Sequence, residues 1–351
     1  MDPVNVADYE ALAAQRLDPG VLGYYAGGAG DELTLRDNVE AFARRRLRPR
    51  VLIDVSDVST ATTVLGSEIS MPVLVAPTAL QRLAHPDGEP GMARAAAAAR
   101  TIFTLSTLAT SRPREVCEQA PPAPRWFQLY AFRDAAVTRA LCDEAVDCGF
   151  DAIVLTVDAP RAGRRERDLR SGFAVPPDVD MPAVRAALGA GACPTPAEFF
   201  SLVDASLTWA AVERLARELD LPVVVKGIQT AQDAALACEH GAAAVVVSNH
   251  GGRQLDGVAA SVDLLPEVVD AVGGRLEVIV DGGIRRGTDV AVALALGARA
   301  VLVGRPALWG LAAAGEEGAR HVLELLRDEL HLALLLLGCP TPAHVTREHV
   351  N

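Results

Sequence analysis

Short runs of apolar residues, rich in Val, Ile and Leu, recur eight times along this chain. Most are separated by stretches with helix-like spacing of apolar positions, at 91–99, 134–148, 230–240 and 261–272. Continuous apolar strands that alternate with helices indicate a parallel sheet covered on both faces. Eight such units with no ninth predict an α/β fold, a closed (β/α)8 TIM barrel. The predicted strands are 73–77, 101–106, 125–130, 152–158, 222–227, 243–248, 277–283 and 300–305.

The spacing of these strands breaks between the fourth and the fifth, whose starts lie 70 residues apart. The interval holds a segment at about 161–206 that is rich in Pro, Ala and Gly, and a helix resumes near 207–209. A loop this long in a compact domain is usually a lid or a disordered segment. We expect an active-site lid, because the segment leaves the end of the barrel where polar residues gather.

The first 70 residues precede the barrel and are predicted to form short helices and turns. Gly27-Gly28-Ala29-Gly30 has the composition of a dinucleotide-binding loop, but no strand precedes it, so we interpret it as a helix-terminating turn. The length of 351 residues suits one large barrel, and we predict a single domain over residues 1–351.

Composition narrows the possible partners. The formal net charge of -12 argues against nucleic acid. No signal peptide is visible, and the apolar run at 332–337 is too short to span a bilayer, so we expect no membrane association and a cytoplasmic location. The six cysteines form no metal-ligand spacing, and Cys142 and Cys148 are interpreted as packing residues of one helix. We expect no metal.

The chain contains one lysine, Lys226, at the end of the fifth predicted strand, whereas every other basic residue apart from histidine is arginine. A compact ammonium group whose pKa can be tuned differs from a planar guanidinium. This pattern indicates a specific need for an ammonium group at this place.

Polar residues end most of the predicted strands, where TIM barrels carry their active sites. Any one of them could be an ordinary polar cap, but together they predict a single site. They are Thr78, Ser106, Gln128, Tyr130, Thr156, Asp158, Lys226, Ser248, His250, Asp281, Arg285, Gly304 and Arg305.

Two glycine- and arginine-containing loops follow the last two strands, Asp281-Gly282-Gly283-Ile284-Arg285 and Gly304-Arg305. Small residues let backbone N–H groups approach an anion, and these two loops form the usual phosphate site of the fold. Two tight turns carrying surface arginines would have the same composition. The pair in this order favours the phosphate site.

His250 follows the sixth strand, and Asp158 ends the fourth. A His–Asp pair makes a base whose protonated form is stabilised, although His250 could also be a core histidine. Arg165 and Arg253 could bind a carboxylate together in fork geometry.

Several motifs make the chain similar to the FMN-dependent 2-hydroxy acid oxidases and dehydrogenases, which include enzymes acting on glycolate, lactate and mandelate. The resemblance extends from Tyr9 to His349. It rests on PTA at 77–79, AHPDGE at 84–89, FQLY at 127–130, LTVDAPRAGRRERD at 155–168, VKG at 225–227, SNHGGRQLD at 248–256 and DGGIRRGTDV at 281–290. It implies bound FMN in a TIM barrel, a small 2-hydroxy acid substrate, O2 as acceptor and assembly as a homotetramer or octamer.

The resemblance also implies a role for each site residue. His250 resembles the catalytic base, Asp158 its orienting carboxylate, and Lys226 the cation beside the flavin. The substrate would contact Tyr24, Tyr130, Arg165, Arg253 and Leu108. The flavin ring and ribityl chain would lie against Pro77, Thr78, Ala79, Ser106, Gln128, Thr156 and Ser248. Ribityl and phosphate would be held by Asp281, Gly282, Gly283, Arg285, Gly304 and Arg305.

The chain departs from the plant glycolate oxidases at Leu108, where they carry Trp, so we expect a substrate larger than glycolate. The lid between about 171 and 205 is shorter than theirs, and Phe199 and Phe200 within it could refill the pocket. Ala79 is the residue expected in oxidases, whereas several relatives that react poorly with oxygen have Gly.

These features predict oxidation of an (S)-2-hydroxy acid to a 2-oxo acid with release of hydrogen peroxide. Three alternatives stay open at this point: a dehydrogenase passing electrons to a quinone or protein carrier, a flavin barrel enzyme acting on a peptide or other substrate, and a non-catalytic flavin-binding protein.

Overall fold

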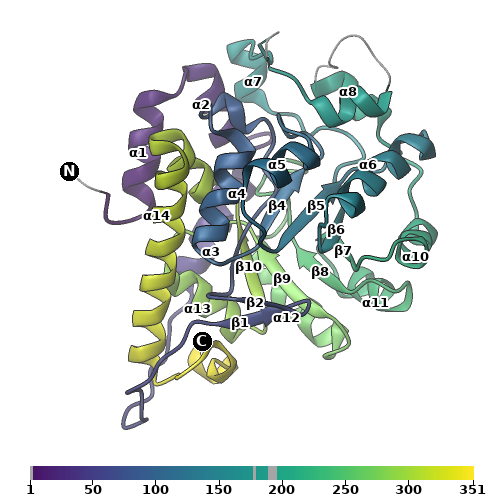
Figure 1. Ribbon diagram of the computed structural model, residues 1–351. Coiled ribbons are helices and arrows are strands. Elements are labelled where there is room, and N and C mark those ends of the chain that lie inside the picture. Colours follow the sequence, from purple (N-terminus) through teal and green to yellow (C-terminus); the bar gives the residue numbers. More distant parts are fainter. Residues whose placement is uncertain (1–2, 177–178, 189–195) are drawn as a thin grey trace.

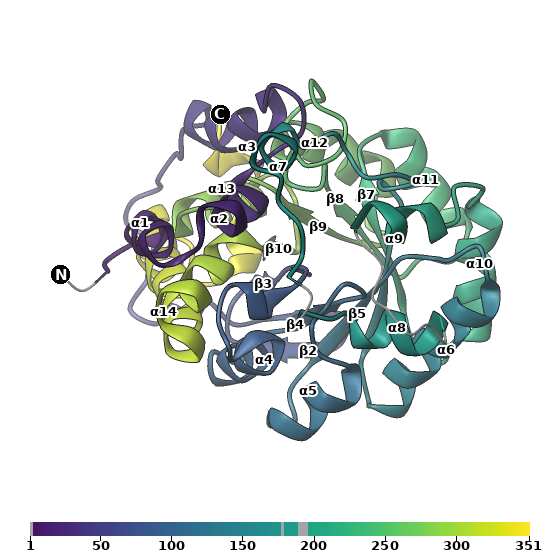
Figure 2. The same ribbon diagram turned by 90° about the horizontal axis from the view of Figure 1, so that it is seen from above.

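The computed structural model describes residues 3–176, 179–188 and 196–351, and a closed barrel of eight parallel strands forms its centre (Figures 1 and 2). Neighbouring strands pair in the order β10-β3-β4-β5-β6-β7-β8-β9. The predicted TIM barrel is confirmed. Its strands are β3 (Val73–Val75), β4 (Phe103–Ser106), β5 (Arg125–Leu129), β6 (Ala152–Thr156), β7 (Val223–Ile228), β8 (Ala244–Val247), β9 (Glu277–Asp281) and β10 (Ala300–Val303).

A helix follows each barrel strand and packs on the outside, as the ring in Figure 2 shows. The last of them is interrupted at Ala314 and Gly315, whose backbone is not helical. The four helices predicted from the spacing of apolar residues are all present. The outer helices are α4 (Gly88–Ala98), α5 (Pro113–Gln119), α6 (Ala135–Asp147), α10 (Trp209–Glu218), α11 (Ala231–Glu239), α12 (Ser261–Val272), α13 (Gly287–Ala295) and α14 (Arg305–Leu337).

Side chains at alternate positions of the strands fill the barrel interior. Trp126, Val154, Val224, Val246 and Ile279 belong to one fully buried apolar cluster. Because side chains of a strand alternate between its two faces, the residues two positions further along also point inward. Those positions lie at the C-terminal ends of the strands and carry Gln128, Thr156, Lys226, Ser248 and Asp281.

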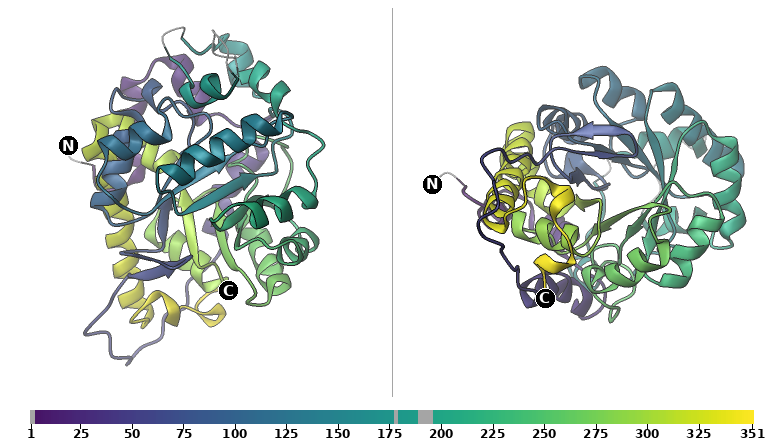
Figure 3. Two further views of the ribbon diagram at one scale, coloured as in Figure 1. Left: turned by 45° about the vertical axis from the view of Figure 1, so that its right-hand side comes forward. Right: turned by 90° about the horizontal axis from the view of Figure 1, so that it is seen from below.

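The N-terminal segment contains α1 (Val6–Arg16), α2 (Pro19–Ala26) and α3 (Leu33–Arg44), as predicted, and Gly27 caps α2. It also contains a hairpin that was not predicted, β1 (Thr62–Val64) and β2 (Ser67–Ile69). The hairpin lies under the barrel, where Val64 and Ile69 join the interior cluster (Figure 3). It closes the end of the barrel opposite the polar residues.

The segment predicted as a lid contains α7 (Glu166–Ser171), α8 (Pro182–Leu188) and α9 (Pro196–Leu202), which lie over the polar end of the barrel (Figures 1 and 2). Its stem is tied to the loop after β8, since the backbone N–H of Gly163 donates to Gln254 Oε1 at 2.9 Å. Single-turn 3-10 helices occur at η1 (Gln81–Leu83), η2 (Pro342–His344) and η3 (Arg347–His349). In the described part of the chain, no helix has both the length and the apolar character needed to cross a membrane.

Candidate active site

A cavity opens at the C-terminal end of the barrel, with about 1220 Å³ of empty space including its open mouth. Two residues of the predicted site do not line it: Asp158 lies behind His250, and Ser248 behind Lys226. The other predicted residues all do, namely Tyr24, Pro77, Thr78, Ala79, Ser106, Leu108, Gln128, Tyr130, Thr156, Arg165, Lys226, His250, Arg253, Asp281, Gly282, Gly283, Arg285, Gly304 and Arg305.

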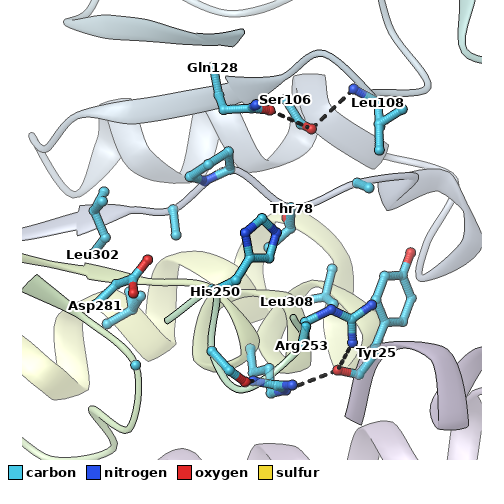
Figure 4. A pocket seen from close by; sticks show the side chains of 18 of the residues that line it. Tyr25, Thr78, Ser106, Leu108, Gln128, His250, Arg253, Asp281, Leu302 and Leu308 are labelled. Atoms are coloured by element: carbon cyan, nitrogen blue, oxygen red, sulfur yellow. Dashed lines mark hydrogen bonds between the residues drawn. The ribbon is translucent and has the colours of Figure 1, made fainter. Parts of the chain in front are cut away.

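His250 stands in the middle of the cavity, between Asp281 on one side and Arg253 on the other (Figure 4). Its Nδ1 lies 2.9 Å from Asp158 Oδ1, and the Asp158 side chain is only 4% exposed. Burial alone would raise the pKa of Asp158, but attraction to His250 and the hydrogen bond with it outweigh burial and lower that pKa. Asp158 is therefore an ionised partner that can stabilise a protonated imidazole.

The backbone around this pair is specialised. His250 has a left-handed conformation with φ of 60°, held by a hydrogen bond of 3.0 Å from its N–H to Ser248 Oγ. Such residues cost about 1–3 kcal/mol and cluster at functional sites. Gly227, next to Lys226, has φ of 113°, and a Cβ there would come within 2.7 Å of the Asp158 Cβ. The glycine of the VKG motif therefore makes room for Asp158.

Lys226 is buried between two partners: its Nζ lies 3.0 Å from Asp281 Oδ2 and 2.9 Å from Ser248 Oγ. Burial would lower the pKa of Lys226, yet the negative charges of Asp281 and Asp158 raise it above its ordinary value. The ammonium group therefore stays charged inside the barrel. The sequence predicts that Lys226 and Asp281 share one site, whereas their ion pair is evident only in the structure.

A chain of hydrogen bonds crosses the floor of the cavity. Gln128 Nε2 donates to Thr156 Oγ1 at 3.0 Å, and Gln128 Oε1 accepts from Ser106 Oγ at 3.2 Å. The same hydroxyl accepts from the N–H of Leu108 at 3.1 Å, which links the floor to the loop that carries Leu108 (Figure 4). These side chains form a fixed polar surface at the tops of three neighbouring strands.

Arg165 and Arg253 approach the same ring, with guanidinium carbons 5.9 Å and 5.1 Å from the centroid of Tyr24. Burial and the positive charge of Arg165 lower the pKa of Arg253 to about 10. Arg165 Nε is buried and has no hydrogen-bond partner among the described residues. Two partly buried cations that repel each other, one of them with an unused donor, form a site for an anion.

A second cationic region surrounds the loops after β9 and β10. Burial lowers the pKa of Arg285 and of Arg305, and Arg253 lowers that of Arg305 further. Gly283, with φ of 89°, is required because a Cβ there would lie 1.9 Å from the carbonyl oxygen of Asn38 in α3. Arg305 also has a structural task, since it donates to the carbonyls of Tyr25, Gly27 and Gly251 at 2.9, 2.9 and 3.0 Å.

The segment predicted as a lid supplies two lining residues whose contacts could not be predicted from the sequence. Met181 and Phe200 line the cavity together with Leu108, and they are 2%, 4% and 8% exposed. The Phe200 and Tyr130 rings lie 5.6 Å apart, and Phe199 packs against Tyr130 at the same distance. In the sequence, Phe200 is marked only by its position in the segment predicted as a lid, and that position does not show which residues its ring contacts. Other lining residues not predicted are Tyr25, Ala76, Leu80, Gly251, Leu302, Val303, Pro306 and Leu308.

The cavity has the features that FMN requires. The cationic region fits the phosphate, and Asp281 Oδ1 is a buried acceptor without a partner among the described residues, as a ribityl hydroxyl needs. Lys226 supplies a buried positive charge on the cavity wall. In the described ranges we find no group of His, Cys, Asp and Glu able to hold a metal ion.

Known enzymes are similar to this chain over nearly its whole length. The chain is 50% identical to glycolate oxidase 5 of Oryza sativa subsp. japonica, over 99% of this chain and 95% of that protein. It is 49% identical to L-lactate oxidase of Nostoc sp., over 96% and 95%. Among solved structures, mandelate oxidase with (S)-4-hydroxymandelic acid superposes with a TM-score of 0.93 at 42% identity, over 99% of this chain and 98% of that one.

The family model described as FMN-dependent dehydrogenase matches residues 13–351. The match covers nearly the whole chain, including every residue of the cavity. The chain therefore belongs to the FMN-dependent dehydrogenase family and is an FMN-dependent oxidoreductase of the 2-hydroxy acid oxidase type.

Proposed function

We propose that this enzyme oxidises an (S)-2-hydroxy acid with an apolar side chain larger than that of glycolate to the 2-oxo acid, with O2 as acceptor and hydrogen peroxide as product. The observation that carries the proposal is the His250–Asp158 pair at 2.9 Å, which faces the same cavity as Arg165 and Arg253. A base and a carboxylate-binding site side by side suit a substrate that has both a removable proton and a carboxylate.

In this proposal the substrate carboxylate binds between Arg165 and Arg253 and relieves their mutual repulsion. Tyr24, whose ring both arginines approach, contributes its hydroxyl. Burial and the charge of Asp158 raise the pKa of Tyr130, so that its hydroxyl stays protonated and can donate to the substrate hydroxyl.

Asp158 occupies Nδ1 of His250, so the Nε2 of His250 is the atom that accepts one of the two protons lost by the substrate. Asp158 stabilises the resulting imidazolium. When bound, FMN would take up the two electrons and the second proton that the substrate loses. The flavin ring would lie against Gln128, Thr156, Ser106, Pro77, Thr78 and Ala79. Its ribityl phosphate would be held by Asp281, Gly282, Gly283, Arg285, Gly304 and Arg305.

Two measurements test this function. Anaerobic addition of glycolate, lactate, 2-hydroxy-4-methylpentanoate and mandelate should bleach the bound flavin, with the (S)-enantiomers active. Readmitted air should restore the colour with one peroxide formed for each 2-oxo acid. Bleaching that air cannot reverse, but a quinone can, would contradict the oxidase and identify a dehydrogenase.

Four expectations from the sequence remain predictions: the single domain, the lid, a cytoplasmic location, and assembly as a tetramer or octamer. Light scattering measures the mass of the assembly and so checks the last of them.

The proposed substrate size rests on the apolar residues Leu108, Met181 and Phe200, all of which line the cavity. Because each buried methylene contributes about 0.8 kcal/mol, we expect kcat/KM for 2-hydroxy-4-methylpentanoate or mandelate to exceed that for glycolate at least about tenfold. Leu108→Trp should narrow or reverse this preference, whereas the volume-conserving Leu108→Met should keep it. A wild-type preference for glycolate would mean that Phe200 and Met181 already fill the space.

A further inference from the structure

Two loops form the side of the cavity that contains Leu108. The loop after β3 carries Ala79 and Leu80, and the loop after β4 carries Leu108; all three residues line the cavity. The loops touch directly, because the N–H of Leu80 donates to the carbonyl of Leu108 at 3.0 Å. The distance between them therefore sets the shape of this wall.

A buried carboxylate joins the two loops from behind. Glu89, in the first turn of α4, is 0% exposed. Its Oε1 accepts the N–H of Gln81 at 3.1 Å and the N–H of Thr110 at 2.7 Å, and its Oε2 accepts the Thr110 hydroxyl. Gln81 belongs to the first loop and Thr110 to the second. One side chain thus holds both loops through their main chains.

Glu89 forms no ion pair among the described residues, and burial raises its pKa, while the hydrogen bonds from Thr110 act in the opposite direction. A buried carboxylate without a cation is costly and is retained only where its hydrogen bonds are satisfied. Glu89 is not among the residues that line the cavity. The free-energy cost of burying this carboxylate therefore indicates that Glu89 has a role in shaping the two loops.

The first loop needs such support because its backbone is strained. Leu80 has φ of 57°, a left-handed conformation that is unfavourable for a residue other than glycine. Its carbonyl accepts the Tyr25 hydroxyl at 2.6 Å, and the Gln81 side chain donates to Thr78 Oγ1 at 2.8 Å. Glu89 holds the residue directly after the strained one.

We propose that Glu89 is a positioning residue that fixes the spacing of these two loops, and that it thereby determines the substrate side-chain preference at Leu108 and the seat of FMN at Thr78 and Ala79. The part concerning substrate rests on the proposed function. When the carboxylate is removed, the N–H groups of Gln81 and Thr110 lose their acceptor and the two loops separate.

The test compares variants of similar size. Glu89→Leu keeps the volume but removes both acceptors, whereas Glu89→Gln retains an acceptor for the two N–H groups and a donor for the Thr110 hydroxyl. Thr101→Val is the control for general destabilisation: it removes a buried hydroxyl that bonds the Val73 carbonyl at 2.5 Å, at the opposite end of the barrel. Substrate preference, FMN affinity and Tm are measured for each.

We expect Glu89→Leu to lower the kcat/KM ratio of 2-hydroxy-4-methylpentanoate to glycolate by at least about fivefold and to weaken FMN binding by a similar factor, as unsatisfied buried donors require. Glu89→Gln should stay within about twofold of wild type in both, and Thr101→Val should lower only Tm. A folded Glu89→Leu enzyme with both values unchanged overturns the proposal, as does an equal shift in Thr101→Val.

Should Glu89→Leu fail to fold, Thr110→Val breaks the same junction more gently and must move both values in the same direction; no movement overturns the proposal. The FMN dissociation constant separates this inference from the proposed function. A wild-type enzyme that oxidises none of the acids contradicts the function, while the order of FMN affinities among these variants still decides the role of Glu89.

Discussion

We expect His250→Gln to slow the anaerobic reduction of bound flavin by a 2-hydroxy acid at least about 100-fold, the usual scale for losing a general base. His250 Nδ1 lies 2.9 Å from a carboxylate that is 4% exposed, so its free nitrogen is the one that can take a proton in the cavity. Glutamine keeps a polar side chain of similar reach but cannot accept that proton. Stopped-flow bleaching under saturating substrate measures the effect.

The left-handed backbone at His250 calls for a second variant as control. Asn tolerates positive φ better than most residues, so His250→Asn removes the base with less backbone strain. Both variants should bind FMN with near wild-type affinity and reduce it equally slowly. If either one reduces the flavin at nearly the wild-type rate, His250 is not the base; if only Gln is slow, the defect lies in the backbone.

The barrel and its polar end could be predicted because they depend on periodicity. A parallel strand buried on both faces is a continuous apolar run, and the period of two then fixes which polar residue faces inward at its end. Lys226 and Asp281 occupy equivalent positions on β7 and β9, so their convergence follows from the fold. Their ion pair depends on side-chain reach across β8, which spacing alone does not give.

The hairpin in the N-terminal segment was not predicted, for a different reason. The β1–β2 hairpin has strands of three residues each, too short for a periodic signal. Its turn residues Leu65 and Gly66, with φ of 45° and 82°, match the type I′ turn, and Gly66 was the available clue.

Contacts that side chains make to backbone atoms could not be predicted from the sequence either. Arg253 donates to the carbonyls of Tyr24 and Gly27 at 2.6 and 2.8 Å, and Arg305 also binds this end of α2. Every residue carries a carbonyl, so no residue type marks the acceptor. Glu89 was hidden for the same reason, because it binds N–H groups 8 and 21 residues away in the chain.

Lys226→Met should lower the midpoint potential of bound FMN. Reduction adds negative charge to the flavin, and two unit charges about 4 Å apart interact by about 4 kcal/mol at an effective dielectric near 20. For a two-electron couple this corresponds to a fall of about 90 mV at most, because water entering the vacated space would screen the charge. Lys226→Arg should also be impaired, since a planar guanidinium does not reproduce the contacts that the compact ammonium makes to Ser248 and Asp281 at 2.9 and 3.0 Å.

The ion pair with Asp281 supplies the control for this prediction. Removing Lys226 leaves the Asp281 carboxylate buried without its cation, which adds to the fall in potential and weakens FMN binding. Asp281→Asn should move the potential in the opposite direction, upward, because it removes a negative charge from the same place. The double variant Lys226→Met/Asp281→Asn should lie between the two.

Spectroelectrochemical titration of the four proteins measures these potentials. A general disturbance of the cavity would weaken FMN binding in both single variants, but it gives no reason for potential shifts of opposite sign. Opposite shifts therefore identify the charge of Lys226 as the cause. An unchanged potential in Lys226→Met would instead mean that this lysine serves to neutralise Asp281 within the barrel, and that the flavin does not sense its charge.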